Sequence, residues 1–358
     1  MTTIQESGND VRIDASTLQT FVADLFGAAG ASDDDAALIA GIAVGTDLRG
    51  AYSHGCALVP GYVGAMLAGR IDPRGRPAVT KDSGAAIVVD GGNSLGHVGL
   101  TFAMERALER ARQTGLAAVA LGGSNHCGAM ASYALQADGH DSIALATTNG
   151  LPTMGWYGGL DRILSINPVG IFIPASEERP VVIDTSFGAA ARGKILVHKQ
   201  KGLPLPEGWA YDAEGYATVD PAAALEGLIQ PAGGYKGASM ALLMGVLASL
   251  LSGGAYGTEL GDFVSGPTPG RDAQFALVIR VGAFEDADRF KARMDGIIRQ
   301  IKASRPAPGF DSVHLPGERA AETAERYRRE GVPVSQATRE ALAKVAADAG
   351  VDPAPVQP

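Results

Sequence analysis

The chain has 358 residues, of which 46% are hydrophobic and 19% charged, so it can bury a sizeable core in one large or two intertwined domains. A formal net charge of −9 argues against a nucleic-acid partner, which would require clustered positive charge. Apolar stretches fall short of the roughly 20 residues that a membrane span needs, and we expect no signal peptide in the polar N-terminus. Cys56 and Cys127 are too few for a secreted disulfide scaffold. We expect a reduced cytoplasmic protein.

Helical patterns come first along the chain. Ser16 and Ser32 precede periodic apolar residues that predict helices over 17–29 and 33–49, and a third helix is expected over 56–68. Short β-branched runs then predict strands at 85–90, 117–121, 142–147, 170–174, 181–183 and 275–281. Further helices are expected at 97–114, 127–138, 236–251, 286–303, 318–329 and 335–347.

This order of elements predicts an α/β fold in which a central sheet domain is inserted between N- and C-terminal helical segments. We expect a discontinuous helical domain formed by residues 1–75 plus 285–350 and a central α/β domain over 76–284. The Pro-rich tail at 351–358 is expected to be disordered.

Two nucleotide-binding patterns are incomplete. The glycine-rich segment 91–96 follows a predicted strand, but Asn93 breaks the G-x-G-x-x-G spacing of a Rossmann dinucleotide site. Residues 188–194 fit G-x4-G-K, but Ile195 stands where a P-loop needs a hydroxyl to hold Mg²⁺. Both readings are therefore weak.

A zinc site is a further alternative, because His54, Cys56, His126 and Cys127 supply two imidazoles and two thiols. Adjacent residues such as His126 and Cys127 rarely point at one metal, so we expect no metal site.

Two histidines stand out from the six in the chain. His54 and His126 lie in polar, glycine-flanked turns, each just before a predicted helix and beside Ser53 or Asn125. A helix N-terminus disfavours imidazolium, and a neutral-range imidazole with an orienting hydroxyl suits general acid–base catalysis. Composition and spacing leave this role and a buried structural role about equally open. For His97, by contrast, the core role is favoured.

Ser53 also suggests a hydrolase, but a Ser and a His adjacent in sequence do not readily form a nucleophile–base pair, and no G-x-S-x-G elbow is present. Ser53 is more plausible as a residue that orients His54. Asp184, Thr185 and Ser186 end a predicted strand with polar groups that can hold a ribose or an amide. Lys236 opens an apolar helix, where its charge is unfavourable unless an anion lies nearby, so a phosphate partner is expected.

In order, the chain contains D-L-R-G-A-Y-S-H-G at 47–55, P-G-Y at 60–62, N-H-C-G at 125–128, N-P at 167–168, Asp184, G-K at 193–194, K-G at 236–237 and L-P-G-E at 315–318. This ordered set, over about residues 14–350, resembles the malate/L-lactate dehydrogenase family that lacks a Rossmann fold and includes ureidoglycolate and sulfolactate dehydrogenases and piperideine-2-carboxylate reductase.

The resemblance implies a homodimer with its own type of NAD(P)-binding domain, with NAD and NADP both open, and a small-molecule substrate. It implies hydride transfer between the nicotinamide and a C=O or C=N carbon, with His54 as proton donor, Ser53 as its support and His126 as an alternative donor. The residues implied to line the cofactor and catalytic cleft are His126, Cys127, Gly128, Ala129, Met130, Asp184, Thr185, Ser186 and Lys236.

Two positions depart from the family's pattern. The family writes S-H-G-x-x-R and T-N-P, whereas this chain has Leu58 and Ile166 in place of the Arg and the Thr that face the substrate. Arg is the natural bidentate partner of a carboxylate. We therefore expect a substrate other than malate or lactate, which either lacks the α-carboxylate or is held by Arg49 or Arg192. A cyclic-imine reductase, and a catalytically idle relative that binds a cofactor or metabolite, remain open.

Overall fold

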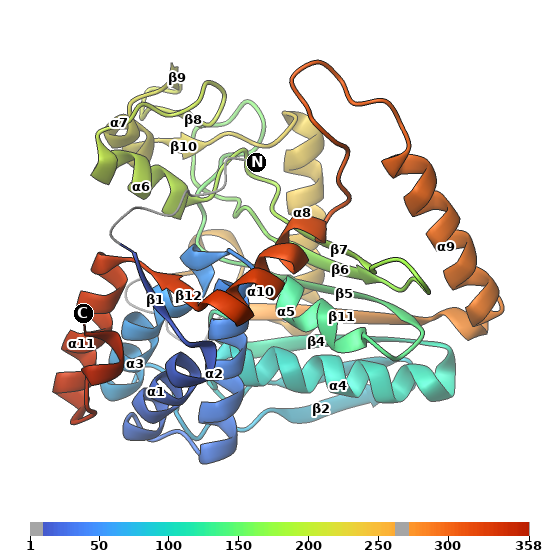
Figure 1. The fold of residues 1–358 in the computed structure, drawn as a ribbon, viewed down its shortest axis with the longest axis horizontal. Coiled ribbons are helices and arrows are strands. Elements are labelled where there is room, and N and C mark those ends of the chain that lie inside the picture. The colour runs from blue at the N-terminus through green and yellow to red at the C-terminus, as the bar shows by residue number, and fades with distance from the viewer. Residues whose placement is uncertain (1–9, 262–271, 358) are drawn as a thin grey trace.

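The computed structural model describes residues 10–261 and 272–357, and a mixed sheet of seven described strands forms its centre (Figure 1). The strand order is β2-β3-β4-β11-β5-β6-β7. The strands are β2 (Ala78–Ser83), β3 (Ala86–Asp90), β4 (Leu116–Ser124), β5 (Ser142–Thr148), β6 (Val169–Ile173), β7 (Val181–Thr185) and β11 (Asp272–Arg280). Among these strands β3 and β4 run parallel, and the other neighbours are antiparallel. The predicted α/β class is confirmed, and the sheet differs from the parallel sheet of a Rossmann domain.

Helices cover both faces of this sheet, because its central strands are apolar on each side. On β4, Ala117, Val119 and Leu121 alternate toward a core shared with α4 (Gly96–Thr114) and α5 (Ala131–Ala134). Helix α8 (Tyr235–Ser249) packs against β4, β5 and β11. Among the described residues, the segment Tyr235–Ser252 is long and apolar enough to cross a membrane, but its small residues Ala238 and Ala241 are buried. One face of this helix packs against the sheet, while Met240 and Leu243 are exposed.

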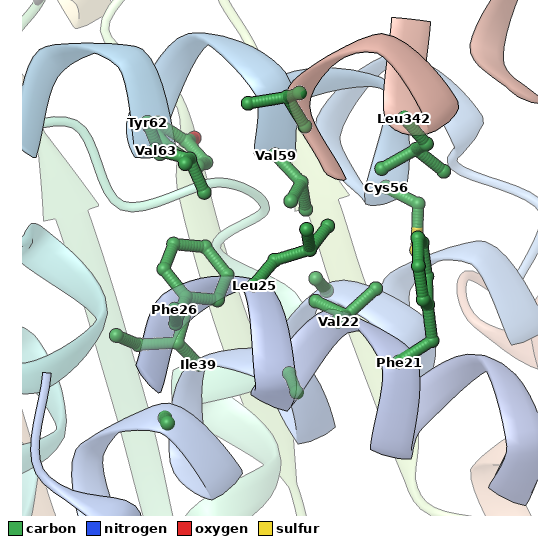
Figure 2. Close-up of a cluster of buried hydrophobic side chains, with 14 of the residues drawn as sticks. Phe21, Val22, Leu25, Phe26, Ile39, Cys56, Val59, Tyr62, Val63 and Leu342 are labelled. Carbon is green, nitrogen blue, oxygen red and sulfur yellow. The ribbon is translucent and has the colours of Figure 1, made fainter. Parts of the chain in front are cut away.

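The two ends of the chain meet in a second core. Strand β1 (Val11–Ile13) pairs with β12 (Val332–Val334), and helices α1 (Ala15–Ala28), α2 (Asp33–Leu48), α3 (Val59–Leu67) and α11 (Gln336–Ala349) enclose one apolar cluster. Figure 2 shows side chains of α3, with Leu342 of α11, facing those of α1. This packing agrees with a discontinuous terminal unit, although the domain boundaries stay predictions.

The C-terminal tail is a correction to the sequence prediction. Residues 354–356 form a short 3-10 turn, and Val356 is buried against the terminal core. The carbonyl of Val356 accepts a hydrogen bond from Arg339 at 3.5 Å. The prediction of disorder is therefore wrong for residues 351–357, because one apolar side chain near the end has a core to enter.

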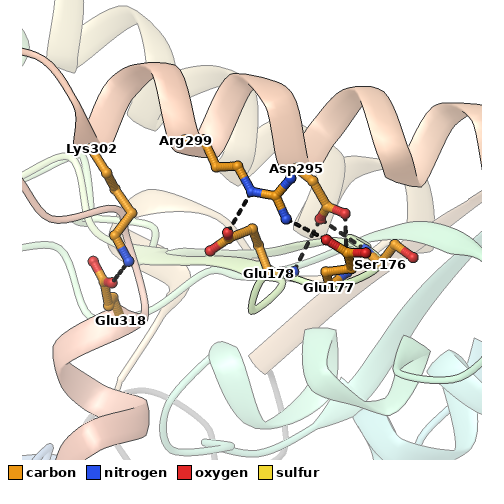
Figure 3. Close-up of polar contacts among 7 residues, drawn as sticks. All are labelled: Ser176, Glu177, Glu178, Asp295, Arg299, Lys302 and Glu318. Carbon is orange, nitrogen blue, oxygen red and sulfur yellow. Dashed lines mark hydrogen bonds and ion pairs between the residues drawn. The ribbon is translucent and has the colours of Figure 1, made fainter.

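Helix α9 (Ala287–Lys302) is held against the central sheet by polar contacts (Figure 3). The carboxylate of Asp295 accepts hydrogen bonds from the backbone N–H groups of Ser176, Glu177 and Glu178 in the β6–β7 turn. Arg299 pairs with Glu177 and Glu178, and Lys302 pairs with Glu318 at the start of α10 (Glu318–Glu330). Helix α9 lies within the residue range predicted for the terminal domain, but these contacts connect it to the sheet and to α10.

A small unit that the sequence patterns did not reveal lies between β7 and α8. It contains α6 (Arg192–Lys201), α7 (Pro221–Glu226) and the three-stranded sheet β10-β8-β9, built from β8 (Ala210–Tyr211), β9 (Ala217–Thr218) and β10 (Leu228–Ile229). Its strands have two residues each, too short for a periodic pattern to emerge.

Three local differences have identifiable causes. Helix α1 is capped by Asp14, which accepts from the Thr17 N–H, and not by Ser16. The predicted helix over 127–138 is shortened to α5 and a 3-10 turn at Leu135–Ala137, preceded by a loop in which Gly128 has a φ of +71°. Strand β2 was missed because all its residues are exposed, so it has no buried face to produce alternation.

Candidate active site

The Ser53-His54 turn lies between two helices of the terminal core. Helix α2 ends at Leu48, a 3-10 turn spans Tyr52–His54, and a second spans Cys56–Leu58 before α3 begins. The Ser53 hydroxyl lies 2.8 Å from Nδ1 of His54, which is the orienting contact that the sequence suggested. Two adjacent residues can make it because the tight turn brings their side chains together.

A buried carboxylate lies beneath this turn. Asp47, 4% exposed, accepts the backbone N–H of Cys56 at 3.0 Å. Burial raises the pKa of Asp47 to about 7, although its contacts with Cys56 act in the opposite direction. Asp47 was not predicted to belong to the site, because a lone Asp near the end of a helix gives no sequence signal of such a role.

His126 lies in the loop after β4 and faces the same place. The rings of His54 and His126 are stacked, with centroids 6.4 Å apart and an angle of 28° between their planes. The structure thus brings together two histidines that are 72 positions apart in the sequence (126 − 54). This juxtaposition defines the candidate active site.

The glycine-rich segment that failed as a nucleotide fingerprint positions His126. The Asn125 side chain donates to the carbonyls of Asn93 and Ser94, and a Cβ on Gly96 would lie 2.0 Å from the Asn125 carbonyl oxygen. Glycine at 96 therefore permits the close approach of the two loops. Its role is packing next to the site.

Tyr62 and His97 complete the surroundings of His126, and neither was singled out for a site role from the sequence. The Tyr62 hydroxyl lies 2.5 Å from Nδ1 of His126, and the Gly128 N–H donates to the same nitrogen at 3.3 Å. His97 is buried and meets the Tyr62 ring edge-on. Burial lowers the pKa of His97 to about 3, so it is a neutral core residue as expected.

Lys194, in the first turn of α6, supplies positive charge beside His54. Burial lowers the pKa of His54, and the Lys194 ammonium lowers it further. A Cβ on the neighbouring Gly193 would lie 3.7 Å from Cβ of Ser53, so the start of α6 contacts the turn. The lowered pKa of His54 is thus caused by burial and by Lys194. At His126, the helix that we predicted directly after the residue begins only at Ala131, so the N-terminus of that helix does not lie next to this ring.

Asp184, at the end of β7, joins the site through the loop that carries His126. Its carboxylate accepts the Ala131 N–H at 3.3 Å. Burial raises the pKa of Asp184, while that hydrogen bond and the charge of Arg49 lower it. Thr185 is exposed, and its hydroxyl donates to the Ser186 carbonyl at 3.3 Å, while Ser186 is partly exposed.

The predicted lining of the cleft is only partly available. The side chains of Cys127 and Met130 are fully buried in the core of the sheet, which leaves Gly128 and Ala129 as the intervening backbone. Lys236 is exposed at the start of α8, next to two glycines with a φ of +68° and no side-chain cap.

Leu58 and Ile166 pack against different hydrophobic clusters. Leu58 is partly buried on the terminal core, and Ile166 lies against the core of the small unit with α6 and α7. The two side chains therefore pack against separate clusters, and that both line one pocket stays a prediction. Of the two alternative cations, Arg49 interacts electrostatically with Asp184, and Arg192 is exposed at the start of α6.

Within residues 10–261 and 272–357, no group of three or more His, Cys, Asp or Glu side chains could hold a metal ion. Cys56 and Cys127 are free, buried thiols, and burial raises the pKa of Cys127 well above its ordinary value.

The arrangement is that of an acid–base site, placed where a mixed α/β sheet meets a helical unit. Two stacked imidazoles, one with an orienting hydroxyl, can move a proton to or from a bound molecule.

The comparisons agree with this class. The family model described as malate/L-lactate dehydrogenase matches residues 13–343. The malate dehydrogenase of Pyrococcus abyssi is 31% identical over 351 residues, covering 96% of each chain. The Δ1-pyrroline-2-carboxylate/Δ1-piperideine-2-carboxylate reductase of Pseudomonas putida is 29% identical over 330 residues, covering 91% of this chain and 94% of the relative. The sulfolactate dehydrogenase structure from Methanocaldococcus jannaschii has a TM-score of 0.90 at 30% identity, covering 96% of this chain and 99% of that one.

The chain belongs to the malate/L-lactate dehydrogenase family. Members of this oxidoreductase family act on CH–OH or C=N groups.

Proposed function

We propose that the protein is an NAD(P)-dependent oxidoreductase that transfers a hydride between nicotinamide and a C=O or C=N carbon, with His54 as the proton donor and acceptor. The observation that carries the proposal is the contact between the Ser53 hydroxyl and His54 Nδ1, beside a second imidazole at 6.4 Å. Family membership supports the reaction class.

The residues would divide the work as follows. Ser53 orients the His54 ring, so that Nε2 is left to exchange a proton with the oxygen or nitrogen of the substrate. The low pKa that burial and Lys194 give His54 favours the neutral form, which accepts a proton from an alcohol or amine. When bound, the nicotinamide supplies or takes up the hydride.

The residues at the start of α8 fit a nucleotide phosphate. Gly233 and Gly234 both have positive φ, the helix lacks a side-chain cap, and Lys236 is exposed there. Unsatisfied N–H groups and a lysine at a helix N-terminus favour an anion. Asp184, Thr185 and Ser186, with the backbone of Gly128 and Ala129, would hold the rest of the cofactor. The titration of NADH and NADPH described below distinguishes between NAD and NADP.

The substrate is proposed to be atypical, because apolar Leu58 and Ile166 stand where the family pattern that this chain resembles has Arg and Thr. Loss of a guanidinium weakens binding of a plain α-carboxylate. Ordinary turnover of pyruvate would count against this part of the proposal.

The test begins with titration of NADH and NADPH, followed by fluorescence, and continues with a screen of 2-oxo acids, ketones and cyclic imines in the reductive direction. We expect binding of at least one cofactor and turnover of at least one substrate. His54→Asn should lower kcat/KM by about 10²–10⁴. His140→Asn is the matched control, since His140 contacts Arg112 on α4 and lies outside the site. Equal rates for the two variants would contradict the role of His54.

Two alternatives lead to different outcomes of the same screen. The Pseudomonas putida reductase among the relatives favours a cyclic-imine substrate, which would appear as turnover of imines without turnover of ketones. A catalytically idle relative would bind the cofactor and turn over none of the compounds.

We also propose a cytoplasmic homodimer. The outer face of α8 exposes Met240, Leu242 and Leu243, and Leu250 and Leu251 extend this surface beyond the helix. A contiguous exposed apolar surface of this kind is typical of a subunit interface. Sedimentation should give twice the mass of one chain.

A further inference from the structure

Two hydrogen bonds meet at one nitrogen of His126. The backbone N–H of Gly128 donates to Nδ1 at 3.3 Å, and the Tyr62 hydroxyl lies 2.5 Å from the same atom. A backbone amide can only donate. Nδ1 must therefore carry a lone pair while this contact exists, and the proton of the neutral ring then lies on Nε2.

The environment of Tyr62 keeps its hydroxyl a donor as well. The side chain is 1% exposed, descends from α3 into the terminal core (Figure 2), and meets His97 edge-on at 5.3 Å between centroids. Burial raises the pKa of Tyr62 well above its ordinary value, and the charge of Asp272 acts in the same direction. The phenol therefore keeps its proton across the working pH range and can donate it to Nδ1.

We infer that Tyr62 is a positioning residue that holds His126 in the neutral, Nε2-protonated form, so that His126 donates a hydrogen bond to the reacting oxygen or nitrogen and leaves proton transfer to His54. This inference rests on the proposed function for its catalytic meaning, but the form of the ring is a property of the protein by itself.

The contacts of His54 differ in kind. The hydroxyl at its Nδ1 belongs to Ser53, which can donate or accept, so the ring can change its protonation state and keep the contact. Protonating His126 at Nδ1 would instead oppose the Gly128 N–H. The two stacked imidazoles are therefore not equivalent.

The proton balance follows. In reduction, the carbon of the C=O or C=N bond gains the hydride of the reduced nicotinamide, its oxygen or nitrogen gains the proton of the His54 imidazolium, and His54 ends neutral. His126 keeps its Nε2 proton throughout and stabilises the developing negative charge, as a fixed donor does in an oxyanion hole.

Selective ¹⁵N-histidine labelling tests the form of the ring directly, because protonated and unprotonated ring nitrogens have well-separated shifts. The signals of His126 are those absent from the spectrum of His126→Gln. In the wild type we expect Nε2 protonated and Nδ1 unprotonated at neutral pH, and a protonated Nδ1 would overturn the inference. In Tyr62→Phe both shifts should move toward a mixture of tautomers. Tyr133→Phe is the matched control, since that buried tyrosine donates to the Cys127 carbonyl; an unchanged Tyr62→Phe spectrum would also overturn the inference.

Kinetics test the division of roles. His126→Gln keeps an N–H near the position of Nε2 and should lose about tenfold in kcat/KM, whereas His126→Ala should lose about 10²–10³. His54→Gln should lose about 10²–10⁴, because an amide cannot transfer the proton. Equal losses for the two His126 variants would overturn the donor role. A wild-type protein without any turnover would refute the proposed function, while the NMR result would still decide the form of the ring.

Discussion

A Cβ on Gly55 would lie 2.0 Å from the Oδ1 atom of Asp47. The residue after the candidate proton donor is thus in direct contact with a buried carboxylate, and that carboxylate accepts the N–H of Cys56 on the other side of the glycine. The close approach shows that glycine is required at position 55 for space. The contact links the position of His54 to the end of α2.

Gly55→Ala should therefore disturb both the fold and the site. Overpacking a buried position typically costs about 1–3 kcal/mol, and displacement of the turn should reduce kcat/KM. Urea denaturation and steady-state kinetics measure the two effects. Gly64→Ala on α3 is the control, because a Cβ there meets nothing within 4 Å. Similar losses in both variants would show that Asp47 is not the cause.

Asp47→Asn should change how stability depends on pH. Burial raises the pKa of Asp47 from 3.8 to about 7. The folded state therefore holds the proton more tightly than the unfolded state, and the stability from this group is complete below about pH 4 and lost as the pH rises to about 7. The amide of Asn can still accept the Cys56 N–H but does not titrate. As the pH rises across this window, the free energy of unfolding of the variant minus that of the wild type should therefore increase, by at most about 1.4 kcal/mol per pH unit.

Urea denaturation at several pH values between 4.5 and 8 provides the measurement. Asp24→Asn, at an exposed carboxylate on α1, is the control and should run parallel to the wild type. A parallel profile for Asp47→Asn would mean that the carboxyl is ionised throughout.

Lys194→Gln should shift the pH profile of oxidation. The Lys194 ammonium adds to burial in lowering the pKa of His54, so its removal should raise that pKa. Since oxidation needs the neutral imidazole, the acidic limb of kcat/KM should move to higher pH. Lys199→Gln, on an exposed position of the same helix, should leave the limb in place. A shift in the opposite direction would exclude an effect of the Lys194 charge on His54.

Asp295→Ala should destabilise the protein through the β6–β7 turn. The carboxylate accepts three backbone N–H groups at 3.0–3.1 Å (Figure 3), and leaving such donors without a partner costs about 1–3 kcal/mol. Thermal or urea unfolding would report the loss. Asp288→Ala, one side of an exposed ion pair on the same helix, should cost less than about 1 kcal/mol. The assignment fails if both substitutions cost the same.

Several features were readable in the sequence because they are local. Long helices and strands with a buried face, such as α2, α4 and β11, appear within about three residues of their predicted positions, since burial imposes a period on apolar residues. Ser53 and His54 interact within one turn, so their pairing was accessible from adjacency alone. Strand β2 and the tail around Val356 escaped because exposure removed the pattern in one case and a single side chain carried the packing in the other.

The relations that give the site its chemistry needed the tertiary structure. His54 meets His126, and Tyr62 meets His126 across 64 positions, because the terminal helices dock onto the end of β4. Lys194 acts electrostatically on His54 from α6, a helix that no periodic pattern in the sequence predicted. The sequence by itself determined the residue types able to exchange a proton and the buried faces that drive folding. The packing of distant segments decided which histidine has a fixed donor at Nδ1, because hydrogen-bond partners are set by distance in space and leave no periodic trace in the chain.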